Sequence, residues 1–235
     1  MSWFRWNCPN CPRKISNVSS SFIGAKMEYH HYLLRISSKV LGRNLLHGYG
    51  KKALDIGCSY GYVVKLLQFY GYEAVGLDLS RTAIFTGKKV FKEANFVVAD
   101  AFKLPFKSKF FNLITAFEVM EHLPYPRMFI KVVHDSLKED GVLILTTPRK
   151  CVMRRVYDFI VGEHTHVNLL KPEELKFLLK ELFNYVKVWI IPYPIPIIRG
   201  PFRYLMRAFL KDLDNFNITT SSYISIHSMI AICIK

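Results

Sequence analysis

Five consecutive residues, Gly57-Cys58-Ser59-Tyr60-Gly61, have the types and spacing to carry chemistry. One interpretation is the G-x-S-x-G turn of a serine hydrolase, in which Ser59 is the nucleophile. The other is a glycine-rich turn that follows a strand, opens a helix and cradles an anionic, nucleotide-like cofactor. The two interpretations make different demands on the rest of the chain.

The hydrolase interpretation needs an acid and a histidine downstream, in that chain order. Asp158 with His164 or His166 meets this requirement on paper, but all three lie within one short stretch instead of following separate strands. The serine turn would also follow the very first strand, whereas a hydrolase places it in a sheet already begun. The sequence therefore disfavours a serine hydrolase.

The cofactor interpretation needs acidic residues where strands end, and the chain has them in order. Asp55 ends the run KALDI and leads into the glycine turn, and a helix is predicted from Tyr60 onward. Asp78 ends the second run, 17 positions after Gly61, close to the spacing at which an acid receives ribose hydroxyls. Open sheets of this kind bind ligands at the carboxyl ends of their strands, so the acids are well placed.

Strand-like runs alternate along the chain with segments of helical spacing. The predicted strands are 52–56, 73–77, 95–99, 111–117, 141–147, 184–191 and about 222–234. Two helical segments between them have apolar faces, made of Val63, Val64, Leu66, Leu67 and Tyr70 and of Leu175, Leu178, Leu179 and Leu182. This alternation predicts an α/β fold, a mostly parallel sheet with helices on both faces.

The rest of the chain is predicted as one domain with a tail. Residues 1–24 are rich in Ser, Asn, Pro and Cys and are expected to form the tail. The domain would occupy 25–235, with a leading helix from about Lys26 to Leu46 that ends near residues 48–50, and an insertion at 192–219 before the last strand.

Two further segments decide which cofactor fold is expected. Asp100 follows the third strand in FVVADAFKLPF, and FNLITAFEVMEHL is followed after one helix by LKEDGVLILTTP. With the two acidic motifs above, this ordered set resembles the class I S-adenosylmethionine-dependent methyltransferases over roughly residues 51–190. The resemblance implies a Rossmann-like fold with a seven-stranded sheet, and an enzyme that transfers a methyl group from S-adenosylmethionine.

The resemblance also implies a role for each cofactor residue. Asp55 would lie near the methionine amine, Gly57 and Gly61 would permit close backbone approach, Asp78 would bind the ribose, and Asp100 would read the adenine amino group. The predicted cofactor site is completed by flanking and loop residues Cys58, Ser59, Leu79, Ala101 and Phe102. The chain departs from the family at Ser59, where a middle glycine is common; serine fits there if its backbone angles are ordinary.

Glu118, Glu121 and His122 follow the fourth strand with the spacing E-x-x-E-H. If a helical turn starts there, this spacing gathers them on one face. The pattern resembles quinone-pathway O-methyltransferases, some of which use these residues to hold a divalent ion. Three roles stay open: capping the turn, acting as a base toward an acceptor hydroxyl, or binding a divalent metal. His164 and His166 are second candidates, with plain loop residues as the alternative.

Near residues 201–211 the sequence predicts a basic amphipathic helix. Its apolar stripe is Phe202, Leu205, Met206, Phe209 and Leu210, flanked by Arg203, Arg207 and Lys211. Such a helix either packs on the domain as a substrate lid or docks on an anionic membrane. With the preceding run IIPYPIPII, it favours a small acceptor that is apolar or lipid-linked.

Composition limits the remaining classes. The 235 residues have a formal charge of +15 and no uninterrupted apolar run of about 18 residues, so a spanning helix is not expected. The chain lacks the features of a secretory signal, and we expect a cytoplasmic protein, with peripheral membrane contact left open. The charge and the stretch WFRW make an RNA methyltransferase the alternative, and a non-catalytic cofactor-binding domain the second alternative.

Cys8 and Cys11 form half of a four-ligand zinc site, for which His30 and His31 are the nearby substitutes. A plain tail is the other interpretation.

Overall fold

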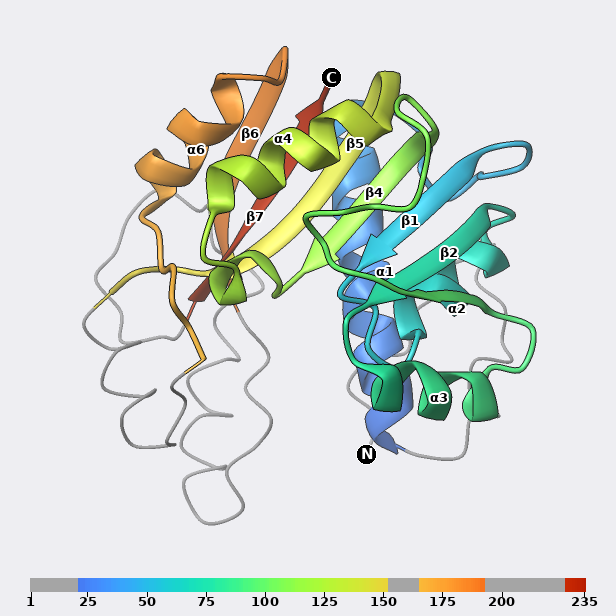
Figure 1. The fold of residues 1–235 in the computed structure, drawn as a ribbon. Coiled ribbons are helices and arrows are strands. Elements are labelled where there is room, and N and C mark those ends of the chain that lie inside the picture. The colour runs from blue at the N-terminus through green and yellow to red at the C-terminus, as the bar shows by residue number, and fades with distance from the viewer. Residues whose placement is uncertain (1–20, 152–164, 193–226) are drawn as a thin grey trace, which may run out of the picture. The chain divides into compact units, whose positions relative to one another are not determined.

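The structure is a computed structural model that describes residues 21–151, 165–192 and 227–235. Figure 1 shows its elements, which are α1 (Ser21–Leu41), β1 (Lys52–Ile56), α2 (Tyr62–Phe69), β2 (Glu73–Asp78), α3 (Arg81–Val90), β3 (Asn95–Val98), β4 (Phe111–Phe117), the 3₁₀ turn η2 (Met120–His122), α4 (Pro126–Ser136), β5 (Leu137–Pro148), α6 (Pro172–Lys180), β6 (Tyr185–Pro192) and β7 (His227–Ile234). The chain divides into two compact units, Met1–Phe106 with Phe110–Thr115 and Lys107–Lys109 with Ala116–Lys235.

The strands form a seven-stranded sheet in the order β3-β2-β1-β4-β5-β7-β6. In the first unit, β1, β2 and β3 run parallel, with Leu54 opposite Val75 and Leu77 opposite Val97. In the second unit, β7 runs antiparallel to both β5 and β6. The mostly parallel seven-stranded sheet expected from the sequence is confirmed.

Burial explains why the first unit follows its sequence pattern. Residues 53–56 of β1 are all buried, as expected for a parallel strand covered on both faces. Helix α2 buries Val63, Val64, Leu66 and Leu67, the face predicted from their spacing. The strand and helix thus fix the start and the end of the loop between them.

The leading helix differs from its predicted range. It begins at Ser21, within the residues expected to be a tail, and ends at Leu41, before the predicted end near residues 48–50. Gly42, with φ of 60°, adopts the left-handed conformation that commonly terminates helices. Helical spacing alone does not reveal a stop formed by backbone angles.

In the second unit, α4 contacts α6; Figure 1 shows α4 in front of β5 and β7, and α6 beside β6. Arg127 and Glu181, which follows α6, form an ion pair of 2.9 Å. Strand β5 begins at Leu137, four residues earlier than predicted, with Asp140 in a left-handed conformation. Leu175 and Leu179 of α6 are fully buried as expected, whereas Leu178 and Leu182 are only half-buried.

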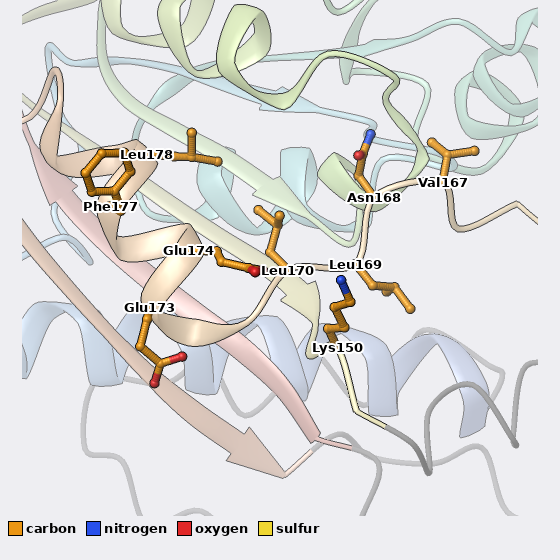
Figure 2. A pocket seen from close by; sticks show the side chains of 9 residues that line it. All are labelled: Lys150, Val167, Asn168, Leu169, Leu170, Glu173, Glu174, Phe177 and Leu178. Carbon is orange, nitrogen blue, oxygen red and sulfur yellow. The ribbon is translucent and has the colours of Figure 1, made fainter.

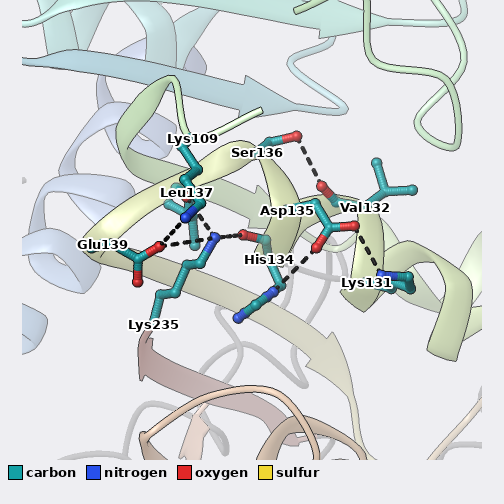
Figure 3. A network of polar contacts seen from close by, with 9 residues as sticks. All are labelled: Lys109, Lys131, Val132, His134, Asp135, Ser136, Leu137, Glu139 and Lys235. Carbon is teal, nitrogen blue, oxygen red and sulfur yellow. Dashed lines mark hydrogen bonds and ion pairs between the residues drawn. The ribbon is translucent and has the colours of Figure 1, made fainter. Parts of the chain in front are cut away.

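A buried lysine joins the end of β7 to the junction of α4 and β5. Lys235 Nζ donates hydrogen bonds of 2.9 Å to the carbonyls of His134 and Leu137, and lies 3.9 Å from a carboxylate oxygen of Glu139 (Figure 3). A buried ammonium group is costly unless it is hydrogen-bonded and its charge is balanced; here two carbonyls accept hydrogen bonds and Glu139 supplies a nearby negative charge. The contact fixes the register of β7 beside β5.

Several predicted features lie outside the described residues: Cys8 and Cys11, residues 193–219 of the predicted insertion, and the basic helix near 201–211. Among the residues that are described, no helix has the length and apolar character needed to cross a bilayer.

Candidate active site

The loop after β1 is held to the end of β2 by backbone hydrogen bonds. The N–H groups of Gly57 and Cys58 both donate to the carbonyl of Leu77, at 2.7 and 3.0 Å. Gly57 and Gly61 have φ of 70° and 86°, angles that favour glycine. The loop therefore turns sharply and delivers the chain into α2 at a fixed place.

Gly61 is required for space as well as for its backbone angles. A Cβ atom at this position would lie 2.3 Å from the ring of Phe96. With Gly61 as its N-cap, α2 has no side-chain cap. The N-terminus of a helix attracts an anionic group, so this end of α2 suits a ligand carboxylate.

Ser59 does not have the ordinary backbone angles on which its prediction depended. Its φ is 48°, in the left-handed region that a middle glycine would occupy without strain. For serine this conformation costs on the order of 1–2 kcal/mol. The Ser59 N–H donates to Oδ2 of Asp78 at 2.8 Å, and this bond helps to hold the strained residue.

Asp78 lies where the sequence predicts a ribose-binding acid. Its second oxygen, Oδ1, accepts the N–H of Ser80 at 2.8 Å. A carboxylate has about four lone-pair sites, and the two backbone bonds leave the others for ribose hydroxyls. Leu79, predicted to pack near adenine, follows directly and is 73% exposed, so its side chain presents apolar surface to a ligand.

Asp55 is buried at the end of β1, and Thr115 Oγ1 donates to its Oδ1 at 2.7 Å. Burial raises the pKa of Asp55 to about 7; the Thr115 bond opposes this shift, and the charge of Asp78 adds to it. A cationic amine beside this carboxyl group would stabilise its ionised form, which burial disfavours. The surroundings of Asp55 thus fit the methionine end of S-adenosylmethionine.

Asp100 follows β3, and its Oδ1 accepts the N–H of Phe102 at 2.9 Å. Asp100 is exposed, while Ala101 and Phe102 are half-buried beside it. All the predicted cofactor residues belong to the first unit, and the strands bring together the ends from which they project. As a set, they fit an adenosine with an amino-acid tail.

The second unit contains a cluster of three ligand-type side chains. Donor atoms of Glu121, His122 and His166 all lie within 4.8 Å of one another. Thr147 Oγ1 donates to Oε2 of the buried Glu121 at 3.2 Å. His122 Nδ1 donates to the carbonyl of Thr165 at 3.2 Å, and its Nε2 lies 3.8 Å from Oε1 of Glu121.

Glu118 is not part of this cluster. The 3₁₀ turn begins at Met120, and Glu118 lies before it with φ of 54° and its N–H bonded to the carbonyl of Thr146. The i, i+3, i+4 argument that grouped Glu118 with Glu121 and His122 is therefore wrong, because Glu118 is not helical. His166, a second candidate from the sequence, completes the group instead.

Comparison with known proteins supports the methyltransferase fold expected from the sequence. A family profile described as "Methyltransferase domain" matches residues 28–187, more than half of the chain. The chain belongs to this family. Its fold and its relatives identify it as a class I S-adenosylmethionine-dependent methyltransferase.

Two curated relatives and one solved structure illustrate the similarity. A ubiquinone biosynthesis O-methyltransferase of Glaesserella parasuis is 28% identical over 58% of this chain and 69% of its own length. The mitochondrial ubiquinone biosynthesis O-methyltransferase of Schizosaccharomyces pombe is 29% identical over 60% of this chain, which spans 56% of that protein. A SAM-dependent methyltransferase from Archaeoglobus fulgidus shares the fold, with a TM-score of 0.61 and 19% identity over 88% of this chain and 94% of its own.

The methyltransferase contains functional contacts that sequence reasoning missed. Thr115 and Thr147 each donate a hydrogen bond to a buried carboxylate. In the sequence, the only indication of these contacts is a threonine within an otherwise apolar strand. Thr165 orients His122 from 43 residues away. His164, also predicted as catalytic, lies outside the described residues.

The structure does not support the serine hydrolase that was considered from the sequence. The loop that contains Ser59 is bonded to Asp78 and Leu77. Burial raises the pKa of the neighbouring Cys58 thiol, so this cysteine is not an activated nucleophile either.

Proposed function

We propose that this methyltransferase acts on a hydroxyl oxygen of a small acceptor that is apolar or lipid-linked. The observation that carries the proposal is the cluster of Glu121, His122 and His166, because a hydroxyl acceptor must lose a proton and this cluster offers a group to accept it. The similarity to enzymes named ubiquinone biosynthesis O-methyltransferases supports the same acceptor class.

Asp55, the loop from Gly57 to Gly61, Asp78 and Asp100 would hold S-adenosylmethionine. When bound, this cofactor would supply a methyl group on a sulfonium: an acceptor oxygen would attack the methyl carbon in line with the C–S bond, and S-adenosylhomocysteine would leave with the C–S electron pair. Asp55 would pair with the methionine amine, and the N-terminus of α2, which has no side-chain cap, would face the methionine carboxylate. Asp78 would accept hydrogen bonds from the ribose.

His122 is the proposed base. Its Nδ1–H is committed to the Thr165 carbonyl, which leaves the Nε2 lone pair for the acceptor proton. The imidazolium formed by this proton transfer would be stabilised by Glu121, whose Oε1 lies 3.8 Å from Nε2. Glu121 is in turn fixed by Thr147 and by backbone N–H groups that donate to its carbonyl.

The same three side chains also fit a divalent ion. Two imidazoles and one carboxylate form a three-ligand set that leaves a coordination position open. The metal set predicted from the sequence contained Glu118; the structure favours His166 in its place. An ion here would lower the pKa of an acceptor hydroxyl. The ion and the base are therefore alternative ways to remove the hydroxyl proton.

The proposal is tested by supplying S-adenosylmethionine with catechol or with RNA and measuring methyl transfer by mass spectrometry. We expect methylation of the catechol hydroxyl and none of RNA. Treatment with a chelator separates the two roles of the cluster. Unchanged activity supports the base, whereas activity that is lost and then restored by magnesium or zinc supports the ion. Transfer to RNA alone would contradict the proposed acceptor.

A further inference from the structure

A groove of about 710 Å³ lies between residues 167–170 and helix α6, within the second unit (Figure 2). This volume is within the range of roughly 300–1,000 Å³ that small-molecule sites occupy. None of the residues used above to hold the cofactor or to accept a proton lines it. The groove is therefore separate from the residues assigned so far.

Large apolar side chains line this groove although they are accessible to water. Val167 is 61% exposed and Phe177 is 65% exposed, and both belong to its lining with the half-buried Leu170 and Leu178. Single exposed apolar residues are common on proteins, but two exposed and three half-buried apolar side chains along one groove, with Leu169 as the fifth, favour an apolar ligand.

The charged residues of the lining do not change this character. Glu174 is used by its own helix, because Oε2 accepts the N–H of Lys171 at 2.7 Å in a capping box. Lys150 and Glu173 are exposed, and Figure 2 shows Glu173 directed away from the leucines. Solvated charges bordering an apolar floor suit a ligand whose hydrocarbon part lies along the floor.

The segment that lines the groove also holds the cluster. The N–H groups of Val167 and Asn168 donate to the carbonyl of Glu121 at 2.9 and 3.0 Å, and the Asn168 side chain donates to the carbonyl of Leu123. His166 of the cluster and Val167 of the groove are consecutive residues. The groove and the cluster are thus joined through one short main-chain segment.

We infer that the groove binds a hydrocarbon chain carried by the methyl acceptor. This inference rests on the proposed function and deepens it, because it assigns the apolar part of the acceptor to Val167, Leu170, Phe177 and Leu178. It makes the acceptor an amphipathic molecule, with a hydroxyl at the cluster and a hydrocarbon chain along α6.

Calorimetric titration of the full chain, saturated with S-adenosylhomocysteine, tests this inference with two probes, catechol and 4-decylcatechol. We expect the decyl chain to tighten binding to the unmodified protein at least about tenfold, from burial of apolar area. Val167→Ser and Phe177→Ser should each lose most of that gain and leave catechol affinity within about twofold. Because both side chains are exposed, neither change should unfold the protein, and Phe177→Leu should retain the gain.

Met128→Ser is the matched control, since Met128 is an apolar residue of α4 that is 49% exposed and does not line the groove. The inference is overturned if the decyl chain gives no gain in the unmodified protein, or if the serine variants of the groove keep the gain in full. Chain-dependent binding without methyl transfer to either probe would contradict the proposed function and uphold the groove.

Discussion

The cofactor residues and the acceptor cluster are positioned in different ways. In the first unit, backbone groups orient the side chains: the N–H groups of Ser59 and Ser80 hold Asp78, and the loop is bonded to the next strand. In the second unit, the cluster depends on a distant segment, whose carbonyl at Thr165 orients His122. One site is formed by neighbouring strand ends, and the other by a long-range contact.

This difference implies that the two sites can be damaged independently. A substitution in the cluster should affect the chemical step, and a substitution at the strand ends should affect cofactor binding. A change that affected both steps equally would show that the division is wrong.

The largest effect is expected for His122→Ala. Loss of a positioned base lowers turnover by about 10²–10⁴-fold, while the cofactor dissociation constant should stay within about twofold. Rapid-quench measurement of kcat together with calorimetry for S-adenosylmethionine tests the split. His47→Ala, which changes an exposed histidine of the first unit, should change neither quantity. A comparable loss of cofactor affinity would instead place His122 at the cofactor.

Asp78→Ala should lower cofactor affinity more than turnover. Loss of charge-assisted hydrogen bonds to the ribose should weaken S-adenosylmethionine and S-adenosylhomocysteine by about 1–3 kcal/mol, with kcat at saturating cofactor much less affected. Titration calorimetry measures the affinity, and Asp135→Ala on α4 is a matched acidic control. Unchanged affinity in the Asp78 variant would remove this residue from the cofactor site.

A smaller effect is expected from pH, through Asp55. The pKa of this carboxyl is raised to about 7, so the free protein holds its proton where an unfolded chain has lost it, and this group's contribution to stability falls as pH rises from about 4 to 7. A cofactor amine binds the ionised form, so cofactor affinity should fall by at most about tenfold per pH unit below 7. Asp55→Asn should remove that slope. A flat affinity profile in the unmodified protein would exclude the pairing.

The sequence predicted well where the first three strands end, because their patterns are strong, and the proposed cofactor residues lie at those ends. Asp55, Asp78 and Asp100 could be placed without knowing any long-range contact. The cluster was harder to predict, since Glu118 leaves the expected turn through a left-handed backbone angle and His166 arrives from another part of the chain. The bond from Thr115 to Asp55 spans 60 positions, and no local pattern indicates such a partner.

The way residues 167 and 168 hold Glu121 has a consequence for how this enzyme can diversify. Both bonds come from main-chain N–H groups, which nearly every amino acid possesses. The side chain at position 167 can therefore vary without loosening the buried glutamate. Under the proposed function, descendants of this protein could exchange one acceptor for another by substitutions at this position, while the proposed base and its buried partner stay in place.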